Sequence, residues 1–278
     1  MQLLKKKIWL MALILAFFLN SQIGGWAQNK TIILATTTST QDSGLLDVLI
    51  PIFEKKTGYF VKTIAVGSGQ ALALGKRGEV DLLLVHSPKE EKEFMSDGYG
   101  ISRRAVMVND FLLVGPAEDP AKIKGTKEAI NAFLKISASS SLFISRGDNS
   151  GTHTQELSIW EAAKINPEGQ RWYQQTGLGM GQTLTIASEK RGYTLTDQGT
   201  YMALRKNLNL EVFWARNKDL RNYYHVILVN PKRWPKVNDK GARALADFLV
   251  GKEAQEIIRT FGLRQFGSPL FFPMANQK

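Results

Sequence analysis

The chain has 278 residues, a formal net charge of +11 and no cysteine. This length suits one large domain or two lobes of ordinary size. Without cysteine the chain has no disulfides and no thiol for a lipid anchor, and its positive charge favours anionic partners. Because the basic residues are scattered and not interleaved with aromatics, we expect no nucleic-acid partner.

The first 27 residues are predicted to be a secretory signal peptide. Three lysines at 5–7 precede an unbroken apolar run at 8–19, and small residues flank Trp26. The run is shorter than the roughly 20 residues of a membrane span, although an uncleaved anchor remains the alternative. Cleavage after Ala27 would remove three lysines and no acids, lowering the net charge from +11 to +8. We expect a soluble periplasmic product that is not a lipoprotein.

In the first half of the chain, short apolar runs alternate with helical patterns. This alternation is typical of parallel strands joined by crossover helices, and so of an α/β fold. Pro51 is expected to kink the first long helix, since proline lacks the amide donor. The predicted strands are 31–35, 60–66 and 81–85, and the predicted helices are 44–56 and 70–76.

The second half repeats the alternation. Thr126 is predicted to cap a helix that buries Ile130, Phe133 and Leu134. The chain is predicted to close with one helix over 241–261. The other predicted elements are strands at 110–114, 142–145 and 224–229 and helices at 151–163 and 182–191.

The two groups of elements predict two lobes. The extended runs 109–114 and 224–229 are interpreted as the two crossovers between them. The first lobe would hold residues 28–110 with 229–278 returning to it, and the second would hold 111–228.

Three strand-to-helix turns are rich in hydroxyls and glycine. They are ATTTSTQDSG at 35–44, VGSGQ at 66–70 and SRGDNSGTH at 145–153. Such turns lie at the carboxyl ends of parallel strands, where free helix amides and the helix dipole hold anions. Capping alone explains a single turn of this kind. Three in one chain, one of them with Arg146, instead predict an anion-binding cradle.

Catalysis at the third turn is the competing hypothesis, with His153 activating Ser150 or Thr152. His153 and Thr152 would point about 100° apart on a helix, so the pair is poorly placed. His86 and His225 are predicted at strand ends in different lobes. Three dispersed histidines and no cysteine give no metal site with recognisable spacing. We therefore expect no enzyme, no metal site and no cofactor, with an exported hydrolase as the alternative.

Arg146 is the one fixed charge of the third turn and can hold an oxyanion through paired donors. The alternative is a structural salt bridge with Asp148. We expect Asp148 to orient Arg146 or to cap the helix through backbone bonds.

Several blocks of sequence occur in order along nearly the whole mature chain. They are ATTTSTQDSGLLDVLIPIFEKKTG, VGSGQAL, GEVDLLLVHSP, NDFLLVGP, FISRGDNSGTHTQE, WYQQTGLGMGQTL and YTLTDQGTY. Together these blocks resemble the periplasmic tungstate-binding proteins of ABC importers. The hydroxyl and SGT turns alone would point only to oxyanion binders in general, phosphate and molybdate binders included.

The resemblance implies a class II periplasmic binding protein. Each of its two lobes would be a mainly parallel sheet flanked by helices, with two crossing strands as hinge. It also implies a tetrahedral oxyanion ligand, tungstate before molybdate, a permease partner in the inner membrane and a monomeric state. A phosphate or sulfate receptor of the same fold is the near alternative. The ligand-binding residues carried over by motif are Thr37, Ser68, Arg146, Thr152 and Thr183, with Thr38 and Ser39 as neighbours of Thr37 that could share its role.

Overall fold

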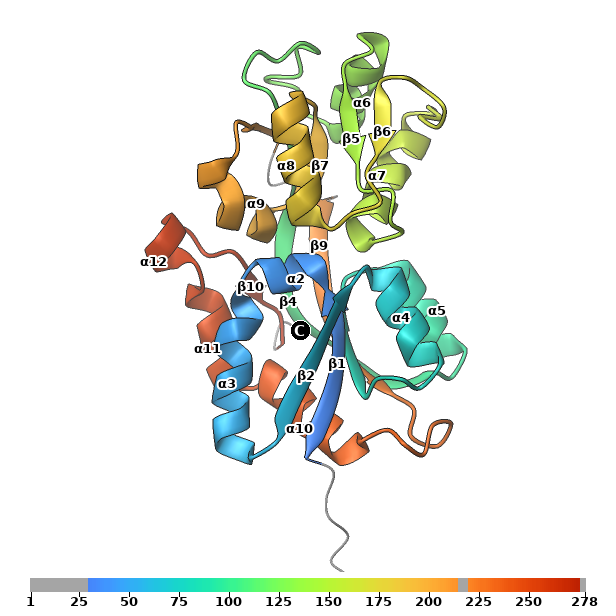
Figure 1. Ribbon diagram of the computed structural model, residues 1–278, viewed down its shortest axis with the longest axis vertical. Helices are drawn as coiled ribbons and strands as arrows, with labels where there is room; N and C mark the ends of the chain where they lie inside the picture. The colour runs from blue at the N-terminus through green and yellow to red at the C-terminus, as the bar shows by residue number, and fades with distance from the viewer. Residues whose placement is uncertain (1–29, 215–219, 276–278) are drawn as a thin grey trace, which may run out of the picture. The chain divides into compact units, whose positions relative to one another are not determined.

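The computed structural model describes residues 30–214 and 220–275 (Figure 1). The predicted signal peptide lies outside these residues. Residues from Thr31 onward form one compact unit. Within the described ranges no helix combines the length and the apolar character that a membrane crossing requires.

The first lobe is built on three parallel strands. β1 (Thr31–Thr37) lies between β2 (Phe60–Val66) and β3 (Leu82–Val85), with Thr31 opposite Phe60 and Leu34 opposite Leu82. The predicted strands are therefore present, and α3 (Leu45–Thr57, with Pro51 inside it) and α4 (Ser68–Lys76) correspond to the predicted helices 44–56 and 70–76. Two further helices, α2 (Thr38–Asp42) and α5 (Pro88–Ser96), were not predicted.

Two long strands connect the lobes. β4 (Gly100–Gly115) pairs antiparallel with β9 (Arg221–Val229), and β9 also pairs antiparallel with β3. Beyond Asp110, β4 continues into the second lobe, where it pairs with β7 (Thr194–Asp197) and β8 (Glu211–Trp214). Figure 1 shows β4 and β9 running between the two groups of helices. The predicted crossovers lie within these two strands, and their antiparallel pairing makes the sheet mixed.

The second lobe surrounds a small parallel pair, β5 (Phe143–Ser145) and β6 (Tyr173–Gln175). Its core is dominated by aromatic rings: Phe133, Phe143 and Trp160 lie with centroids 4.4–5.4 Å apart. Its helical segments are α6 (Ala129–Ala138), α7 (Gly151–Ala162), α8 (Met180–Lys190), α9 (Gln198–Leu204) and the 3₁₀ turn η1 (Arg205–Asn207).

The predictions that Thr126 caps α6 and that Ile130 and Leu134 are buried by it are wrong. The helix begins after Glu128, and Thr126 does not cap it. Ile130 and Leu134 are 37% and 41% exposed, whereas Ala132, Phe133 and Ile136 are buried. Packing of Phe133 against the tilted rings of Phe143 and Trp160 sets the rotation of the helix, which leaves Ile130 and Leu134 partly exposed.

The chain returns to the first lobe after β9. The single closing helix that we expected is wrong: α10 (Asp239–Val250) and α11 (Lys252–Thr260) are separated by Gly251, whose backbone is extended. An extended residue breaks the helical hydrogen-bond ladder, so the two apolar faces can turn independently onto the core. The segment ends with α12 (Leu263–Phe266) and β10 (Phe272–Pro273), which pairs with β4.

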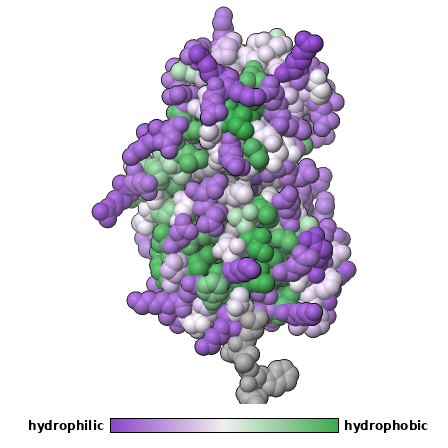
Figure 2. Space-filling view, in the orientation of Figure 1, coloured by the Kyte–Doolittle hydropathy of each residue, from purple (hydrophilic) through white to green (hydrophobic). Residues whose placement is uncertain are grey.

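The buried apolar residues fall into separate clusters. Two clusters draw on residues 32–107 together with 224–271, and two others draw on residues 111–220. The division follows the two-lobed architecture, while the exact lobe limits, 28–110 with 229–278 and 111–228, stay a prediction. On the face shown in Figure 2 the surface is mainly hydrophilic, with small hydrophobic patches between polar residues.

Candidate functional site

The first hydroxyl-rich turn joins β1 to α2. Thr37 is the N-cap of α2, since its Oγ1 accepts from the Thr40 amide at 3.3 Å and lies 2.7 Å from the Thr40 hydroxyl. Thr38 is the first residue of the helix, and its Oγ1 accepts from Arg146 Nη2 at 3.2 Å. Thr37 therefore shapes the turn, whereas Thr38 reaches the second lobe.

The second turn places Ser68 at the start of α4. Gly67 is the N-cap, and Ser68 is fully buried. Among the described residues the Ser68 hydroxyl has no hydrogen-bond partner. A buried donor left without an acceptor costs about 1–3 kcal/mol, so this hydroxyl is suited to a ligand oxygen.

The third turn carries Arg146 between β5 and α7. Its side chain is 1% exposed, and its Nη2 donates to Asp148 Oδ2 at 2.5 Å and to Thr38. Within the described part of the chain, Nε and Nη1 have no partner. A buried guanidinium with two unused nitrogens is suited to bind an anion, because it keeps a full positive charge and N–H donors in a fixed plane.

Asp148 uses both of its carboxylate oxygens inside the turn. Oδ2 accepts from Arg146, and Oδ1 accepts from the backbone amide of Ser150 at 3.1 Å. The carboxylate thus orients Arg146 and binds the backbone before α7, as expected. Both functions leave it poorly placed to accept a proton from a ligand.

The N-terminus of α7 completes the third turn. Ser150 is the N-cap and accepts from the His153 amide at 3.2 Å. Thr152 is 1% exposed, and its Oγ1 has no partner among the residues described. Ser150 is therefore used for capping, while Thr152 keeps a free buried hydroxyl.

Thr183 lies in the first turn of α8. Its Oγ1 lies 2.9 Å from the Thr176 hydroxyl and donates to the Gly179 carbonyl at 3.0 Å. A Cβ placed on Gly179 would lie 3.4 Å from the Thr38 side chain, so the start of α8 also faces the first turn. Of the six residues predicted to bind ligand, Thr38 and Arg146 meet directly, and Thr37 and Thr183 bond within their own turns. The hydroxyls of Ser68 and Thr152 have no partner in the part of the chain that the structure describes.

His86 belongs to the same neighbourhood and was not predicted as a site residue. It follows β3, is 2% exposed, and its Nε2 lies 3.3 Å from the Ser39 hydroxyl. Burial, with a smaller effect from the charge of Arg146, lowers the pKa of His86 to about 3, so the ring is neutral. Its position at the end of a buried strand was the available signal, because ligand-facing residues gather there.

Asp197 and Thr200 were also missed, although they lie in the YTLTDQGTY block. Asp197 caps α9 by accepting from the Thr200 amide at 2.9 Å, and burial raises the pKa of its carboxyl. The Thr200 hydroxyl donates to Asp197 Oδ2 at 2.7 Å and lies 3.4 Å from the Ser39 carbonyl. These residues support the first turn from the second lobe.

The histidines do not form the catalytic arrangement considered above. His153 Nδ1 accepts from the Asn149 amide at 3.0 Å, which holds the turn, and the Ser150 hydroxyl meets the His153 backbone rather than its ring. His225 is not in a different lobe from His86: it lies within β9, opposite Val85 of β3. The described residues contain no group of three or more His, Cys, Asp or Glu side chains that could hold a metal.

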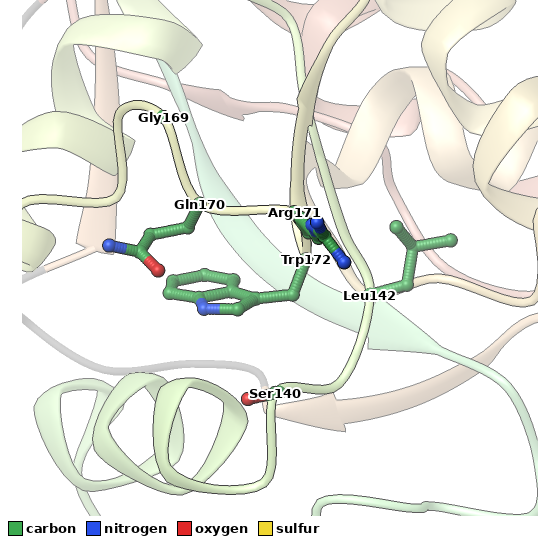
Figure 3. A pocket seen from close by; sticks show the side chains of 6 residues that line it. All are labelled: Ser140, Leu142, Gly169, Gln170, Arg171 and Trp172. Carbon is green, nitrogen blue, oxygen red and sulfur yellow. The ribbon is translucent and has the colours of Figure 1, made fainter.

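A separate hollow of about 640 Å³ lies on the second lobe (Figure 3). It is formed by the stretch between α6 and β5 and by the loop before β6, and no residue of the three turns lines it. Its walls mix one cation with an indole ring and neutral side chains, so it is not the predicted anion cradle. The lining residues are Ser140, Leu142, Gly169, Gln170, Arg171 and Trp172.

Comparison with known proteins identifies the fold family. Residues 24–253 match the model of the PBP superfamily domain. The chain is 48% identical over 247 residues to the tungstate-binding protein TupA of Peptoclostridium acidaminophilum, covering 88% of this chain and 86% of that protein.

Two solved structures agree with this comparison. The tungstate ABC transporter structure from Geobacter sulfurreducens is 47% identical, with a TM-score of 0.76, over 83% of this chain and 98% of that one. The tungstate-binding protein TupA from Desulfovibrio alaskensis G20 is 43% identical, with a TM-score of 0.73, over 88% and 99%. The chain therefore belongs to the PBP superfamily, and within it resembles the tungstate-binding proteins.

Proposed function

We propose that this protein is the extracytoplasmic substrate-binding component of an ABC importer and that it binds tungstate between its two lobes. One observation carries the proposal: buried donor atoms of Ser68, Arg146 and Thr152 lack partners within the described chain, at turns of both lobes that meet. The tungstate-binding names of its relatives support the choice of ion.

The donor set suits a dianion that carries no proton. Arg146 supplies one full positive charge, and the N-termini of α4, α7 and α8 add partial charge and free amides. Hydroxyls supply the remaining donors, and burial strengthens each charge-assisted bond. We propose Thr37, Thr38, Ser68, Arg146, Thr152 and Thr183 as the ligand-binding region, with Thr37 and Thr183 acting mainly through the shape of their turns.

Phosphate is the near alternative, because a protonated phosphate benefits from an acceptor in the site. Asp148 is the acceptor that the third turn offers, and its two oxygens are engaged by Arg146 and the Ser150 amide. This engagement favours tungstate over phosphate. Sulfate has the charge of tungstate but is smaller, and molybdate is close to tungstate in size.

We further propose that the protein binds without turnover, is secreted by its signal peptide, acts as a monomer and delivers the ion to a permease. The use of Ser150 and His153 within the turn supports binding over hydrolysis.

Calorimetric titration of residues 28–278, stripped of bound ions by unfolding and refolding, tests the proposal. Tungstate, molybdate, sulfate and phosphate would be added separately at fixed pH and salt. We expect tight binding of tungstate at one site per chain, with sulfate and phosphate silent. Tight phosphate binding with tungstate silent would make the protein a phosphate receptor, and silence from all four ions would refute oxyanion binding.

A further inference from the structure

Three glycines at the helix starts beside the proposed site face the opposite lobe at short range. A Cβ built on Gly151 would lie 2.5 Å from the backbone oxygen of His86 and 2.7 Å from its Nδ1, and its three nearest atoms all belong to His86. A Cβ on Gly69 would lie 3.1 Å from the Asn149 carbonyl oxygen, and one on Gly67 would lie 3.4 Å from the Asp148 carbonyl oxygen. The backbones of the two lobes therefore already touch here.

Close approach, rather than backbone conformation, explains Gly69 and Gly151. None of the three has a positive φ, so each backbone angle is open to alanine. Gly69 and Gly151 also lie inside α4 and α7, where glycine is a poorer helix former than alanine. What glycine provides at these positions is the absence of a side chain between the lobes.

We propose that Gly151 and the backbone of His86 form the stop that ends closure of the lobes, and that this stop sets the smallest oxyanion that both lobes can hold. The inference rests on the proposed function. The stop lies next to the donors: Thr152 follows Gly151 in α7, and Ser68 lies between Gly67 and Gly69 in α4. The distance between the donors of the two lobes is therefore fixed by this contact.

The first-lobe side of the stop is firmly held. The His86 ring packs on Tyr224 of β9 with centroids 4.6 Å apart, and its Nε2 lies 3.3 Å from the Ser39 hydroxyl. The next amide, that of Ser87, donates to the buried Glu91 carboxylate at 2.8 Å. A backbone oxygen held on both sides cannot move aside, so the second lobe must remain at this distance.

A rigid stop discriminates against ions that are too small. Once the backbones touch, the lobes cannot approach further to grip a smaller tetrahedral dianion such as sulfate from both sides. Some donors would then stay unpaired while buried, which weakens binding. A larger ion of the same charge meets the donors of both lobes at the stop.

Alanine substitutions at the three glycines test the stop, because their clearances differ. We would titrate wild type, Gly67→Ala, Gly69→Ala and Gly151→Ala with sodium tungstate and with sodium sulfate, and measure the radius of gyration by small-angle scattering with and without tungstate. Gly67→Ala is the matched control, since its added methyl group makes only ordinary contact.

We expect tungstate affinity to fall in the order of clearance. The loss should be less than about threefold for Gly67→Ala, about tenfold for Gly69→Ala and about 100-fold or more for Gly151→Ala, as bonds to one lobe are lost. Tungstate-saturated Gly151→Ala should keep a larger radius of gyration than saturated wild type. The Tm of Gly151→Ala without ligand should not fall below that of wild type, because alanine is a better helix former than glycine.

Other results would overturn the stop. If wild type binds tungstate and all three variants bind it equally well, the contact does not limit closure. If Gly67→Ala loses as much tungstate affinity as Gly151→Ala, the loss does not follow the clearances and the stop is also refuted. If Gly151→Ala does not fold, the tungstate affinities of Gly69→Ala and Gly67→Ala still test the stop, because equal affinities would contradict it. If wild type binds none of the oxyanions, the proposed function fails and the stop fails with it.

Discussion

Arg146 is oriented within the described structure by Asp148 and Thr38, which hold one of its nitrogens, while two others have no partner among the described residues. Such an arrangement limits the loss of side-chain entropy on binding, which favours affinity. The motif predicted the arginine and its acidic neighbour. It did not separate Thr37 from Thr38, because hydroxyls one residue apart in a turn differ in function only through the direction in which the helix start points them.

Arg146→Ala should weaken tungstate binding by about 100-fold or more, since at least one charge-assisted bond worth about 1.5–3 kcal/mol is lost and Asp148 is left uncompensated near the anion. Isothermal titration calorimetry measures the change. Arg171→Ala is the matched control, because Arg171 is an exposed arginine of the same lobe and should bind as wild type does. Equal affinity of the two variants would contradict the assigned role of Arg146.

Thr152→Val should reduce tungstate affinity by about tenfold, because it removes one buried donor while keeping the shape of the side chain. Thr154→Val, two residues further along α7, is the control with nearly the same chemistry. If the two valine variants bind tungstate equally, the free hydroxyl of Thr152 does not face the ligand.

At the scale of the elements, helix α7 contains Glu156, a buried carboxyl group that is a weaker acid than usual. Glu156 is 2% exposed, accepts from Tyr173 Oη at 2.7 Å and from Trp160 Nε1 at 3.1 Å, and so ties α7 to β6. Burial raises the pKa of Glu156 from 4.5 to about 7. Between these two values the folded protein holds a proton that the unfolded chain has released.

The stability contributed by protonated Glu156 should therefore be complete below about pH 4.5 and lost as the pH rises toward 7. The loss should approach about 3 kcal/mol in the free energy of unfolding. Glu156→Gln should lack this loss, because its amide is always neutral and can still accept from Tyr173. Urea unfolding of each protein at pH 5 and pH 8 measures this loss of stability. Glu161→Gln, at an exposed position of the same helix, is the control. The same dependence of stability on pH in wild type and Glu156→Gln would contradict the prediction.

Helix α5 is attached to both crossing strands by one buried carboxylate. Glu91 accepts from Arg103 Nε of β4 at 2.8 Å and lies 2.9 Å from His225 Nδ1 of β9. Glu91→Ala should lower the free energy of unfolding by about 3 kcal/mol, because Arg103 keeps a largely buried charge without its partner. Exposed Glu93→Ala on the same helix should change stability little. A similar urea midpoint for both variants would show that the attachment contributes nothing.

The start of β4 was not predicted from the sequence, because Arg103 and Arg104 interrupt the apolar pattern. The strand nevertheless begins at Gly100, where it pairs with β9, and the two arginines have acidic partners in Glu91 and Asp247. The buried strands 31–35 and 81–85 needed no such partners, and their apolar runs predicted them. The apolar spacing continues across Gly251, so the sequence predicts one helix where the structure has two.

At the scale of the molecule, ligand binding and stability are coupled through the folded state. Tungstate at 100 times its dissociation constant should raise the free energy of unfolding by about 2.7 kcal/mol, if the unfolded chain does not bind it. Thermal unfolding with increasing tungstate measures this as a rising Tm. Arg146→Ala, with affinity about 100-fold lower, should gain only about 0.4 kcal/mol or less over the same concentrations. A rise in Tm equal to that of wild type would place the ion elsewhere.

The two-lobed organisation could be predicted from the sequence because both crossovers are extended runs that contain no helix start or stop signals. The approach of the lobes could not, since it depends on backbone clearances at Gly67, Gly69 and Gly151 that involve residues far apart in the chain. A glycine next to a hydroxyl residue predicts a tight turn, but this local pattern is the same whether or not another lobe lies opposite the turn.

The continuity of β4 through both lobes has a mechanical consequence. A force that separated the lobes would act along β4 and β9, and so along covalent backbone, rather than across the hydrogen bonds that join the two strands. A pair of adjacent strands resists stretching but bends and twists with little resistance. The connection is therefore stiff in tension and compliant in rotation, which leaves hinge bending as the soft motion between the lobes.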